Sequence, residues 1–532
     1  MSAFTGTGRL ARLILRQERV KLAFWVLALG SLPAITAQSF LELYSTEASR
    51  RELAATIGSN PAFSAILGPL RGSSIGALTT WRLLVIIGTL VGVMAVLTMI
   101  RHTRLEEETG RRELLGSTVV GRHGPLAAAI LVTVAAALVA GIVQLAGLIG
   151  VGLEAPGSVA FALATAGMGT FFAGVAAVAA QLSASTGVTR GIGLGALGAF
   201  FLLRIVSEST GVGALAWLTP FGWAVELSPF AGERWWVVVA WLAGFLALCG
   251  LALALSSRRD VGEGWLARRA GVARAGAGLR GPLGLAWRQH RAGLVGWCVA
   301  VAVMGVVMGS FAESIGGLVA DSPQLAEILA MLGGVEGITD AFFMSIVGIV
   351  AILVSGYAIR TVLRLQQEEE LLRTEFILST ATTRARLAGS HLIFALAGPA
   401  VMLAVSGAVA GIVYGLSAGQ PFAEAARIAS AALAHLPAVW VMAGVAMALY
   451  GAAPGLTGVA WAALVAFLFL GQLGPILGLP QWAMNLSPFT HVPAVPVEPF
   501  EPAPVLWLVG VALTLTFAGL ARFRTRDVPW VG

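Results

Sequence analysis

Long runs of apolar residues are the feature that most limits how this chain can fold. Each run is long enough to cross a bilayer as a helix of about 20 residues. The twelve predicted spans cover residues 22–41, 76–100, 126–153, 158–184, 188–206, 234–256, 290–312, 338–362, 387–416, 424–452, 456–478 and 503–522. Only 11% of the residues are charged, against about 25% in a soluble domain. We therefore expect an all-α integral membrane protein.

A charge cluster follows the second predicted span and recurs after the eighth. In both copies, three glutamates are followed by an arginine, a further glutamate and a closing arginine. The first copy contains Glu106, Glu107, Glu108, Gly110, Arg111, Glu113 and Arg122. The second contains Glu368, Glu369, Glu370, Arg373, Glu375 and Arg384. Charges are rare in this chain, so the same order at two equivalent places indicates an internal repeat.

Other segments match at similar offsets. The pairs are Leu15-Arg16-Gln17 with Trp287-Arg288-Gln289, Leu218-Thr219-Pro220-Phe221 with Leu486-Ser487-Pro488-Phe489, and Arg259-Asp260-Val261 with Arg526-Asp527-Val528. The shared order predicts two tandem six-helix halves, 1–256 and 288–532. A linker rich in Gly, Ala and Arg over 257–287 joins them, and we expect it in the cytoplasm.

The distribution of basic residues predicts the orientation. Most of the 34 Lys and Arg residues lie before the first span, in 101–124, in 257–291, in 360–386 and after 521. Basic loops stay on the cytoplasmic side, so both termini and both charge clusters are expected inside a cytoplasmic, or inner, membrane. The net charge of +7 is therefore attributed to membrane topology and not to nucleic-acid binding.

Residues 1–21 place several arginines opposite an apolar face, which predicts an amphipathic helix on the inner membrane surface. A signal peptide is the alternative, but the equivalent stretch beginning at Trp287 lies deep inside the chain. Two outer stretches, 211–232 and 479–502, mix Trp, Phe and Pro. They are expected to form short re-entrant or interfacial helices.

The two charge clusters suit a contact surface for a soluble partner. Glu107 with Arg111, and Glu369 with Arg373, are spaced i,i+4 and are expected to pair along a helix face. We expect these side chains to lie in water, so that reversing their charges would leave folding intact. The alternative is a solvated helical loop, which two copies at equivalent positions disfavour.

The first cluster, from Glu107 to Leu115, resembles the coupling-helix region of ABC exporter permeases of the type 2 class. The whole chain is similar to the fused, two-half permeases known as exporters of polyketide antibiotics. The second copy departs from the motif, with Leu372 in place of Gly110 and Thr374 in place of Arg112. The resemblance implies two ATP-binding subunits per chain, which bind ATP and Mg and dock on the two clusters.

The residues also indicate that the chain has no ATPase site of its own. A P-loop requires a Gly-Lys-Ser/Thr sequence, and the only lysine, Lys21, follows Val20. ATP hydrolysis is therefore expected in another polypeptide. Cys249 and Cys298 lie inside apolar runs, so no disulfide framework and no metal site is expected.

Aromatic residues in three spans are candidates for an apolar substrate cavity. They are Phe200, Phe201, Phe342, Phe343, Phe467 and Phe469. The resemblance places lining residues in the second and fifth spans of each half; the alternative is ordinary packing or lipid contact. Arg204, Glu208 and His435 lie in or near spans, where a charge is costly unless sheltered. They belong either to a substrate path or to local hydrogen-bonded structure.

These features predict the membrane subunit of an ATP-driven exporter of hydrophobic or amphiphilic small molecules, such as antibiotics. One rival is a proton-driven secondary transporter, which twelve spans in two halves also suit. That mechanism needs a chain of ionisable groups through the membrane, and the span centres show none. The other rival is a lipid-handling or sensing partner of an ABC ATPase.

Overall fold

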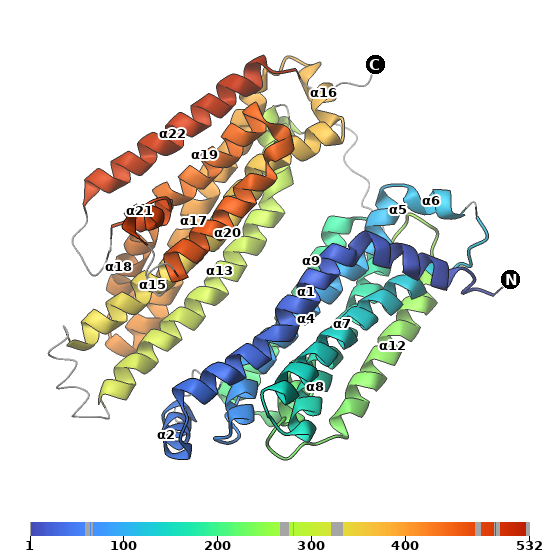
Figure 1. The fold of residues 1–532 in the computed structure, drawn as a ribbon. Coiled ribbons are helices and arrows are strands. Elements are labelled where there is room, and N and C mark those ends of the chain that lie inside the picture. The colour runs from blue at the N-terminus through green and yellow to red at the C-terminus, as the bar shows by residue number, and fades with distance from the viewer. Residues whose placement is uncertain are drawn as a thin grey trace. The chain divides into compact units, whose positions relative to one another are not determined.

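The computed structural model describes residues 2–58, 64, 67–116, 118–266, 276–279, 281–320, 334–473, 480–493, 495 and 501–527. This part of the chain is helical and contains no β-strand. The chain forms two compact units, Met1–Gly271 and Val272–Gly532. Figure 1 shows each unit as a bundle of long helices.

The long helices account for most of both units. Those of the first unit are α1 (Thr7–Leu43), α4 (Ile75–Ile100), α7 (Gly124–Gly150), α8 (Ala155–Leu182), α9 (Thr186–Thr210) and α12 (Val237–Ser257). Those of the second are α13 (Pro282–Ala320), α15 (Gly334–Glu370), α17 (Arg384–Ala418), α18 (Pro421–Ala434), α19 (Leu436–Ala452), α20 (Gly458–Leu473) and α22 (Pro502–Thr525). Shorter helices include α2 (Glu47–Gly58), η2 (Ala277–Leu279) and η3 (Pro454–Leu456).

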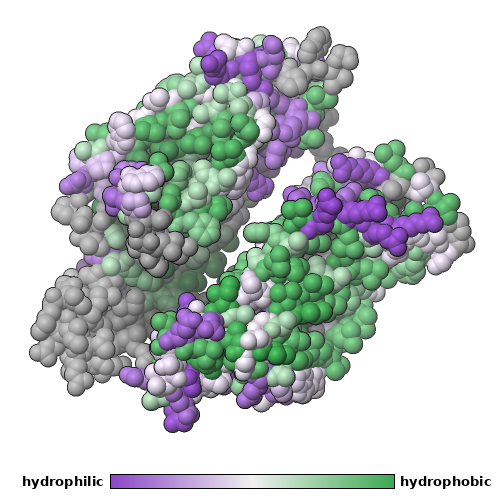
Figure 2. All heavy atoms as spheres, viewed as in Figure 1, coloured by the Kyte–Doolittle hydropathy of each residue, from purple (hydrophilic) through white to green (hydrophobic). Residues whose placement is uncertain are grey.

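Eleven helices in the described part of the chain are long and apolar enough to cross a membrane, six in the first unit and five in the second. The predicted span 456–478 corresponds to α20, whose described residues form a shorter apolar helix; residues 474–479 lie outside the described ranges. Apolar side chains cover the flanks of both units, while hydrophilic ones gather near helix ends (Figure 2). The fold is that of a multi-pass helical membrane protein.

The predicted surface helix over 1–21 is not a separate element. It is continuous with the first span in α1, whose N-terminal turns run at an angle to the rest (Figure 1). The junction contains no Gly or Pro, and most of its residues are good helix formers. The buried residues Leu10, Ile14, Glu18 and Leu22 follow one another at i,i+4 spacing. The expected apolar face is only partly buried, because Leu13 and Val20 are exposed.

A proline inside α1 creates a polar contact between three helices. Pro33 has no N–H, so the carbonyl of Leu29, four residues earlier, loses its helical partner. The Gln144 side chain of α7 donates to that carbonyl at 3.3 Å, and Thr165 of α8 donates to Gln144. Freed backbone groups within a bilayer must be satisfied by protein, so this buried network compensates for the proline.

The corresponding helices pack together in each unit when α18 and α19 are counted as one in chain order. In the first unit α1 packs on α7, α4 on α8, and α12 on α8. In the second unit α13 packs on α17, α15 on α19, and α22 on α19.

The predicted span 424–452 is interrupted at His435, which separates α18 from α19. Pro437 lies in the first turn of α19, where its missing N–H is tolerated but where it cannot continue α18. His435 is buried, and its Nδ1 lies 3.1 Å from the carbonyl oxygen of Ala431. This contact supports the local hydrogen-bonded interpretation of the histidine.

Short helices occupy the described parts of the stretches 211–232 and 479–502, which the sequence predicts to lie outside. The first stretch contains α10 (Gly213–Ala216) and α11 (Pro220–Glu226), and the second contains α21 (Gln481–Met484) and the 3₁₀-helix η4 (Pro488–His491). Thr219 caps α11 by accepting from Gly222 N–H at 2.9 Å. Phe221 is fully buried, so this stretch is anchored in the first unit's core.

Close packing of α19 on α22 gives a test of the fold. A Cβ added at Gly519 of α22 would collide with the carbonyl oxygen of Met447, whereas one added at Gly510 of the same helix meets no atom within 4 Å. We expect Gly519→Ala to lower the free energy of unfolding by about 1–3 kcal/mol, as overpacking does. Gly510→Ala should be neutral or slightly stabilising. Thermal unfolding in detergent measures both, and equal midpoints would contradict this helix contact.

Candidate functional site

The first charge cluster lies where α4 ends and the chain turns away from the bundle. After Ile100 the helix continues as a π-helical turn, η1 (Arg101–Leu105), and then as α5 (Glu106–Glu108). Gly110 has a φ of +73° and redirects the chain into the short helix α6 (Arg111–Gly116). π-Helical turns are rare and concentrate at functional sites.

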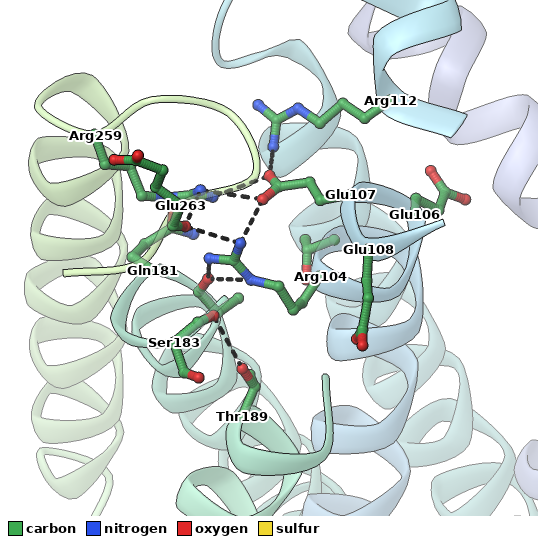
Figure 3. A network of polar contacts seen from close by, with 12 residues as sticks. Arg104, Glu106, Glu107, Glu108, Arg112, Gln181, Ser183, Thr189, Arg259 and Glu263 are labelled. Atoms are coloured by element: carbon green, nitrogen blue, oxygen red, sulfur yellow. Dashed lines mark hydrogen bonds and ion pairs between the residues drawn. The ribbon is translucent and has the colours of Figure 1, made fainter. Parts of the chain in front are cut away.

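Glu107 is the centre of a buried network of ion pairs (Figure 3). Arg259, beyond the end of α12, donates to both carboxylate oxygens, from Nη2 at 2.9 Å and from Nη1 at 3.0 Å. Arg104 of η1 donates to Oε2 at 2.7 Å, and Arg112 of α6 donates to Oε1. One carboxylate therefore joins the ends of α4 and α12 to α6.

Arg104 extends this network to a further helix. Its side chain is completely buried, and its Nε donates to the Ala180 carbonyl oxygen, in the last turn of α8, at 3.1 Å. Its Nη1 also donates to the backbone oxygen of Glu263 at 2.9 Å. Gln181, next to Ala180, accepts from Arg259 Nε at 2.7 Å. These bonds satisfy the buried guanidinium groups, which would otherwise be costly.

The neighbouring glutamates point in other directions (Figure 3). Glu108 accepts from the backbone N–H of Thr186, the first residue of α9, at 2.8 Å. A carboxylate at a helix N-terminus is favoured by the free N–H groups and the helix dipole. Glu106 lies 3.4 Å from Nδ1 of His102. Glu107 and Glu108 thus attach the turn to the end of α12 and to the start of α9, while Glu106 contacts a residue of the turn itself.

Glu18 ties α1 to the same turn. It is buried, and Arg101 donates to its two oxygens at 2.8 and 2.7 Å. His102 Nε2 lies 3.3 Å from Glu18 Oε1. The N-terminal third of α1 and the nearby ends of α4, α8, α9 and α12 are therefore all connected to the segment 101–112.

The expected pair between Glu107 and Arg111 does not form. Glu107 is turned inward to the three arginines just described, while Arg111 is exposed. The i,i+4 rule applies to a continuous helix, and Gly110 breaks the helix between these residues. The expectation that the whole cluster lies in water is also wrong, because Glu107 is buried.

The second cluster contains a simpler form of the same network. Glu369, at the end of α15, is buried and accepts from Arg526 Nη2 at 2.8 Å on each oxygen. The Tyr450 hydroxyl of α19 donates to Glu369 at 2.6 Å. The Arg526 guanidinium lies over the rings of Tyr450 and Phe523, at 5.0 and 5.4 Å from their centres. Arg526 takes the place of Arg259.

The expected pair between Glu369 and Arg373 is likewise wrong. Arg373 is exposed and lies 3.8 Å from Glu368 instead. Glu368 also forms an ion pair with Arg364 at 2.9 Å, one turn earlier in α15. Glu370 accepts from Gln366 at 2.9 Å. Within α15, Glu368 and Glu370 therefore pair with residues one turn earlier, while Glu369 forms the long-range contact with Arg526.

The closing arginines have equivalent roles. Arg122 Nη2 donates to the backbone oxygens of Ser256 and Arg259, at 3.2 and 3.0 Å. Arg384 Nη1 donates to the backbone oxygens of Phe523, at 3.3 Å, and of Arg526. Each closing arginine thus binds carbonyls at the end of the last long helix of its own unit.

The turn that follows the glutamates is also preserved. Leu372, at the position that matches Gly110, has a φ of +56°. This left-handed conformation costs a residue with a side chain about 1–2 kcal/mol. The second unit therefore keeps the backbone path of the first although it lacks the glycine, and the chain continues into α16 (Arg373–Leu378).

Both turns present a short helix to the surroundings. On α6, Arg111 and Glu113 are exposed and the Leu114 side chain is 75% exposed. On α16 the matched residues Arg373 and Glu375 are exposed and the Phe376 side chain is 77% exposed. Hydrophilic side chains surround both places (Figure 2). Each short helix thus carries an exposed apolar side chain together with one basic and one acidic residue.

The six candidate cavity phenylalanines occupy varied environments. Phe200 lies 5.9 Å, ring centre to ring centre, from Phe171, and Phe201 lies 5.5 Å from Phe221. Phe343 is fully buried and contacts Phe342 and Tyr414. Phe467 packs against the core of the second unit, whereas Phe469 is 56% exposed. Most of these side chains take part in helix packing, and their role in a cavity stays a prediction.

Arg259, Arg526, Glu18 and Tyr450 are central to these networks, and the sequence had not placed them in the site. The sequence did contain a signal for the two arginines, because Arg259-Asp260-Val261 matches Arg526-Asp527-Val528. An arginine found at equivalent places suggests an acidic partner that is also found at equivalent places. Glu18 and Tyr450 gave no comparable signal. Glu18 is one of several polar residues in the stretch 16–21, and Tyr450 is a single polar side chain in an apolar helix.

Comparison with known proteins adds two findings. Residues 279–524 match the family described as "Multidrug efflux system permease Rv1217c, C-terminal domain". The chain is 41% identical over 528 residues to the multidrug efflux system permease protein Rv1217c of Mycobacterium tuberculosis (strain ATCC 25618 / H37Rv). This match covers 99% of the chain and 96% of the relative.

The burial of Glu107 predicts unequal effects of two similar substitutions. Glu107→Gln leaves three arginines without their carboxylate, and breaking a buried pair in this way costs about 3–5 kcal/mol. Glu113→Gln changes an exposed residue of α6 and should change stability by about 0.5 kcal/mol or less. The measurement is thermal unfolding of the purified full chain in detergent. If the two variants unfold at the same temperature, Glu107 does not hold the turn together.

Proposed function

The chain belongs to the family of multidrug efflux system permeases, and we propose that it is the membrane subunit of an ATP-driven exporter of the ABC type 2 permease class. The observation that carries this proposal is the pair of short helices, α6 and α16. Each presents matched charges around one exposed apolar side chain, Leu114 or Phe376. Exposed apolar groups ringed by polar ones are typical of protein interfaces.

The buried networks would make these helices effective coupling elements. A force applied to α6 passes through Glu107 to Arg104 and Arg259, and so to the ends of α8 and α12. In the second unit it passes from α16 to Glu369, Tyr450 and Arg526. Docking of an ATP-binding subunit on each short helix would then move long helices as rigid bodies.

We further propose twelve membrane helices in two tandem six-helix halves, with α20 as the eleventh. The corresponding helix contacts in the two units support this arrangement. So do the equivalent contacts of Glu107 with Arg259 and of Glu369 with Arg526. Both termini and both short helices would face the cytoplasm, because basic residues concentrate at these ends.

Two copies of an ATP-binding subunit would supply the energy, with ATP and Mg bound in those subunits. The chain's only lysine, Lys21, lacks P-loop surroundings, which supports this division. The proposed cargo is hydrophobic or amphiphilic small molecules, in agreement with the relative's name of multidrug efflux permease. Polyketide antibiotics are a specific candidate from the sequence resemblance.

Docking can be tested at the exposed apolar side chains. We expect the double substitution Leu114→Ser and Phe376→Ser to abolish co-purification of the ATP-binding subunit and to remove drug resistance. Exposed side chains contribute little to folding, whereas an interface anchor is worth about 2 kcal/mol or more. Phe422→Ser is the matched control, because Phe422 is 84% exposed at the start of α18, far along the chain from both short helices. Retained binding by the double variant would refute docking on α6 and α16.

The energy source can be tested by reconstitution in liposomes. The chain together with its ATP-binding subunit should transport drug when ATP and Mg are present and no proton gradient exists. The chain alone should hydrolyse no ATP. An uncoupler added at constant ATP should leave transport unchanged. Loss of transport on uncoupling would favour a proton-driven transporter, and ATP hydrolysis without any transport would favour a sensing or lipid-handling role.

A further inference from the structure

A cavity of about 280 Å³ lies beside the Glu107 network in the first unit. It is lined by Arg112, Arg122, Ser256, Arg259, Asp260 and Val261. One water molecule needs only about 10–15 Å³ of accessible cavity volume, so this cavity has room for several. The cavity is thus large enough for a small polyatomic ion with some of its hydration.

The charges around the cavity do not balance. Arg104, Arg112 and Arg259 share one carboxylate, Glu107. Arg122 bonds to backbone carbonyls, and among the described lining residues Asp260 is the only acid. Burial lowers the pKa of Arg112, and the charges of Arg259 and Arg122 lower it further, against the opposing effect of Glu107. The arginines therefore repel one another across the cavity.

Hydrogen-bond donors remain available in the lining. In the described part of the chain, Arg112 bonds through Nη1 only and Arg122 through Nη2 only. A guanidinium group carries five N–H donors in a planar fork. The fork matches the oxygen spacing of carboxylates and phosphates, and this is why arginine is preferred for phosphate recognition.

The cavity also lies at the end of a helix with an apolar exposed face. Ser256 is in the last turn of α12. Earlier turns of this helix expose Val239, Leu242, Leu246 and Leu251, and Val261 in the cavity lining is 58% exposed. In a membrane protein such a face contacts lipid chains. A lipid lying along α12 would place its headgroup near the arginines.

We propose that Arg112 and Arg122, in the field of Arg259, form a binding site for an anionic phosphate group. An anionic phospholipid headgroup and free phosphate share this chemistry. Basic pockets at the inner ends of membrane helices are suited to such headgroups. The site requires no ATP-binding subunit, so it stands independently of the proposed coupling.

The second unit offers an internal comparison. Arg384 and Arg526 match Arg122 and Arg259, but Thr374 stands where Arg112 does, and it is buried. Glu369 therefore faces one arginine where Glu107 faces three. The excess of positive charge belongs to the first unit, and the phosphate site is specific to it.

The test is a titration of the purified full chain in an uncharged detergent. The probes are short-chain phosphatidylglycerol, short-chain phosphatidylcholine and inorganic phosphate, and the readout is the unfolding temperature. A ligand that binds the native state raises this temperature. We expect at least one anionic probe to raise it and the zwitterionic lipid to have no effect. A response to phosphatidylglycerol at lower concentration identifies a lipid site, and a stronger response to inorganic phosphate identifies a free-phosphate site.

Variants assign the response to the cavity. Arg112→Thr, which copies the second unit, and Arg122→Gln should weaken the apparent affinity about tenfold or more, as the loss of a charge-assisted hydrogen bond does. Arg112→Lys keeps the charge without the fork and should give an intermediate affinity. The matched controls are Arg111→Gln, an exposed neighbour outside the lining, and Arg384→Gln in the second unit. No response in the unsubstituted chain, or equal responses in all variants, would overturn the proposal.

Discussion

A buried carboxylate paired with an arginine from the far end of the same unit is the interaction on which each half depends. Removing a carboxylate and a guanidinium from water costs several kcal/mol per ion. The structure offsets this cost only by surrounding each charge with donors and acceptors, as at Glu107 and Glu369. The geometry must therefore be kept. Glu107 and Arg259 are 152 residues apart in sequence, so one contact fixes where the second and last long helices of the unit meet.

Much of the fold was predictable from the sequence because membrane helices are marked by length and apolarity alone. The charge clusters were also found, since charges stand out in such a chain. Their burial was not predictable, because spacing along a helix describes only local neighbours. That rule predicts Arg111 and Arg373 as the partners, whereas Arg259 and Arg526 are the actual ones. The break at His435 depends on the single residue Pro437, and the continuity of α1 depends on the residues at its junction. An average of hydropathy over a window does not reveal such individual residues.

The two halves keep the same framework with different chemistry. Glu107 has three arginine partners, while Glu369 has one arginine and Tyr450. Glu18 of α1 pairs with Arg101, whereas the matched residue of α13 is His290, whose Nε2 lies 2.9 Å from Nδ1 of His391. The ion pair of Glu18 with Arg101 in the first unit thus corresponds to a contact between two histidines in the second.

This difference has a mechanical consequence under the proposed coupling. In the first unit, α6 takes part directly in the Glu107 network, because its Arg112 binds Glu107. In the second unit the matched residue is Thr374, and α16 joins the network only through the backbone that leads to Glu369. A force on α16 would then pass through the strained backbone turn at Leu372. In the first unit the same turn is made by Gly110, and the ion pair between Arg112 and Glu107 bridges it. Under this proposal, equal forces on the two short helices would be transmitted more directly in the first unit, and the two units would be mechanically inequivalent although their helices pack alike.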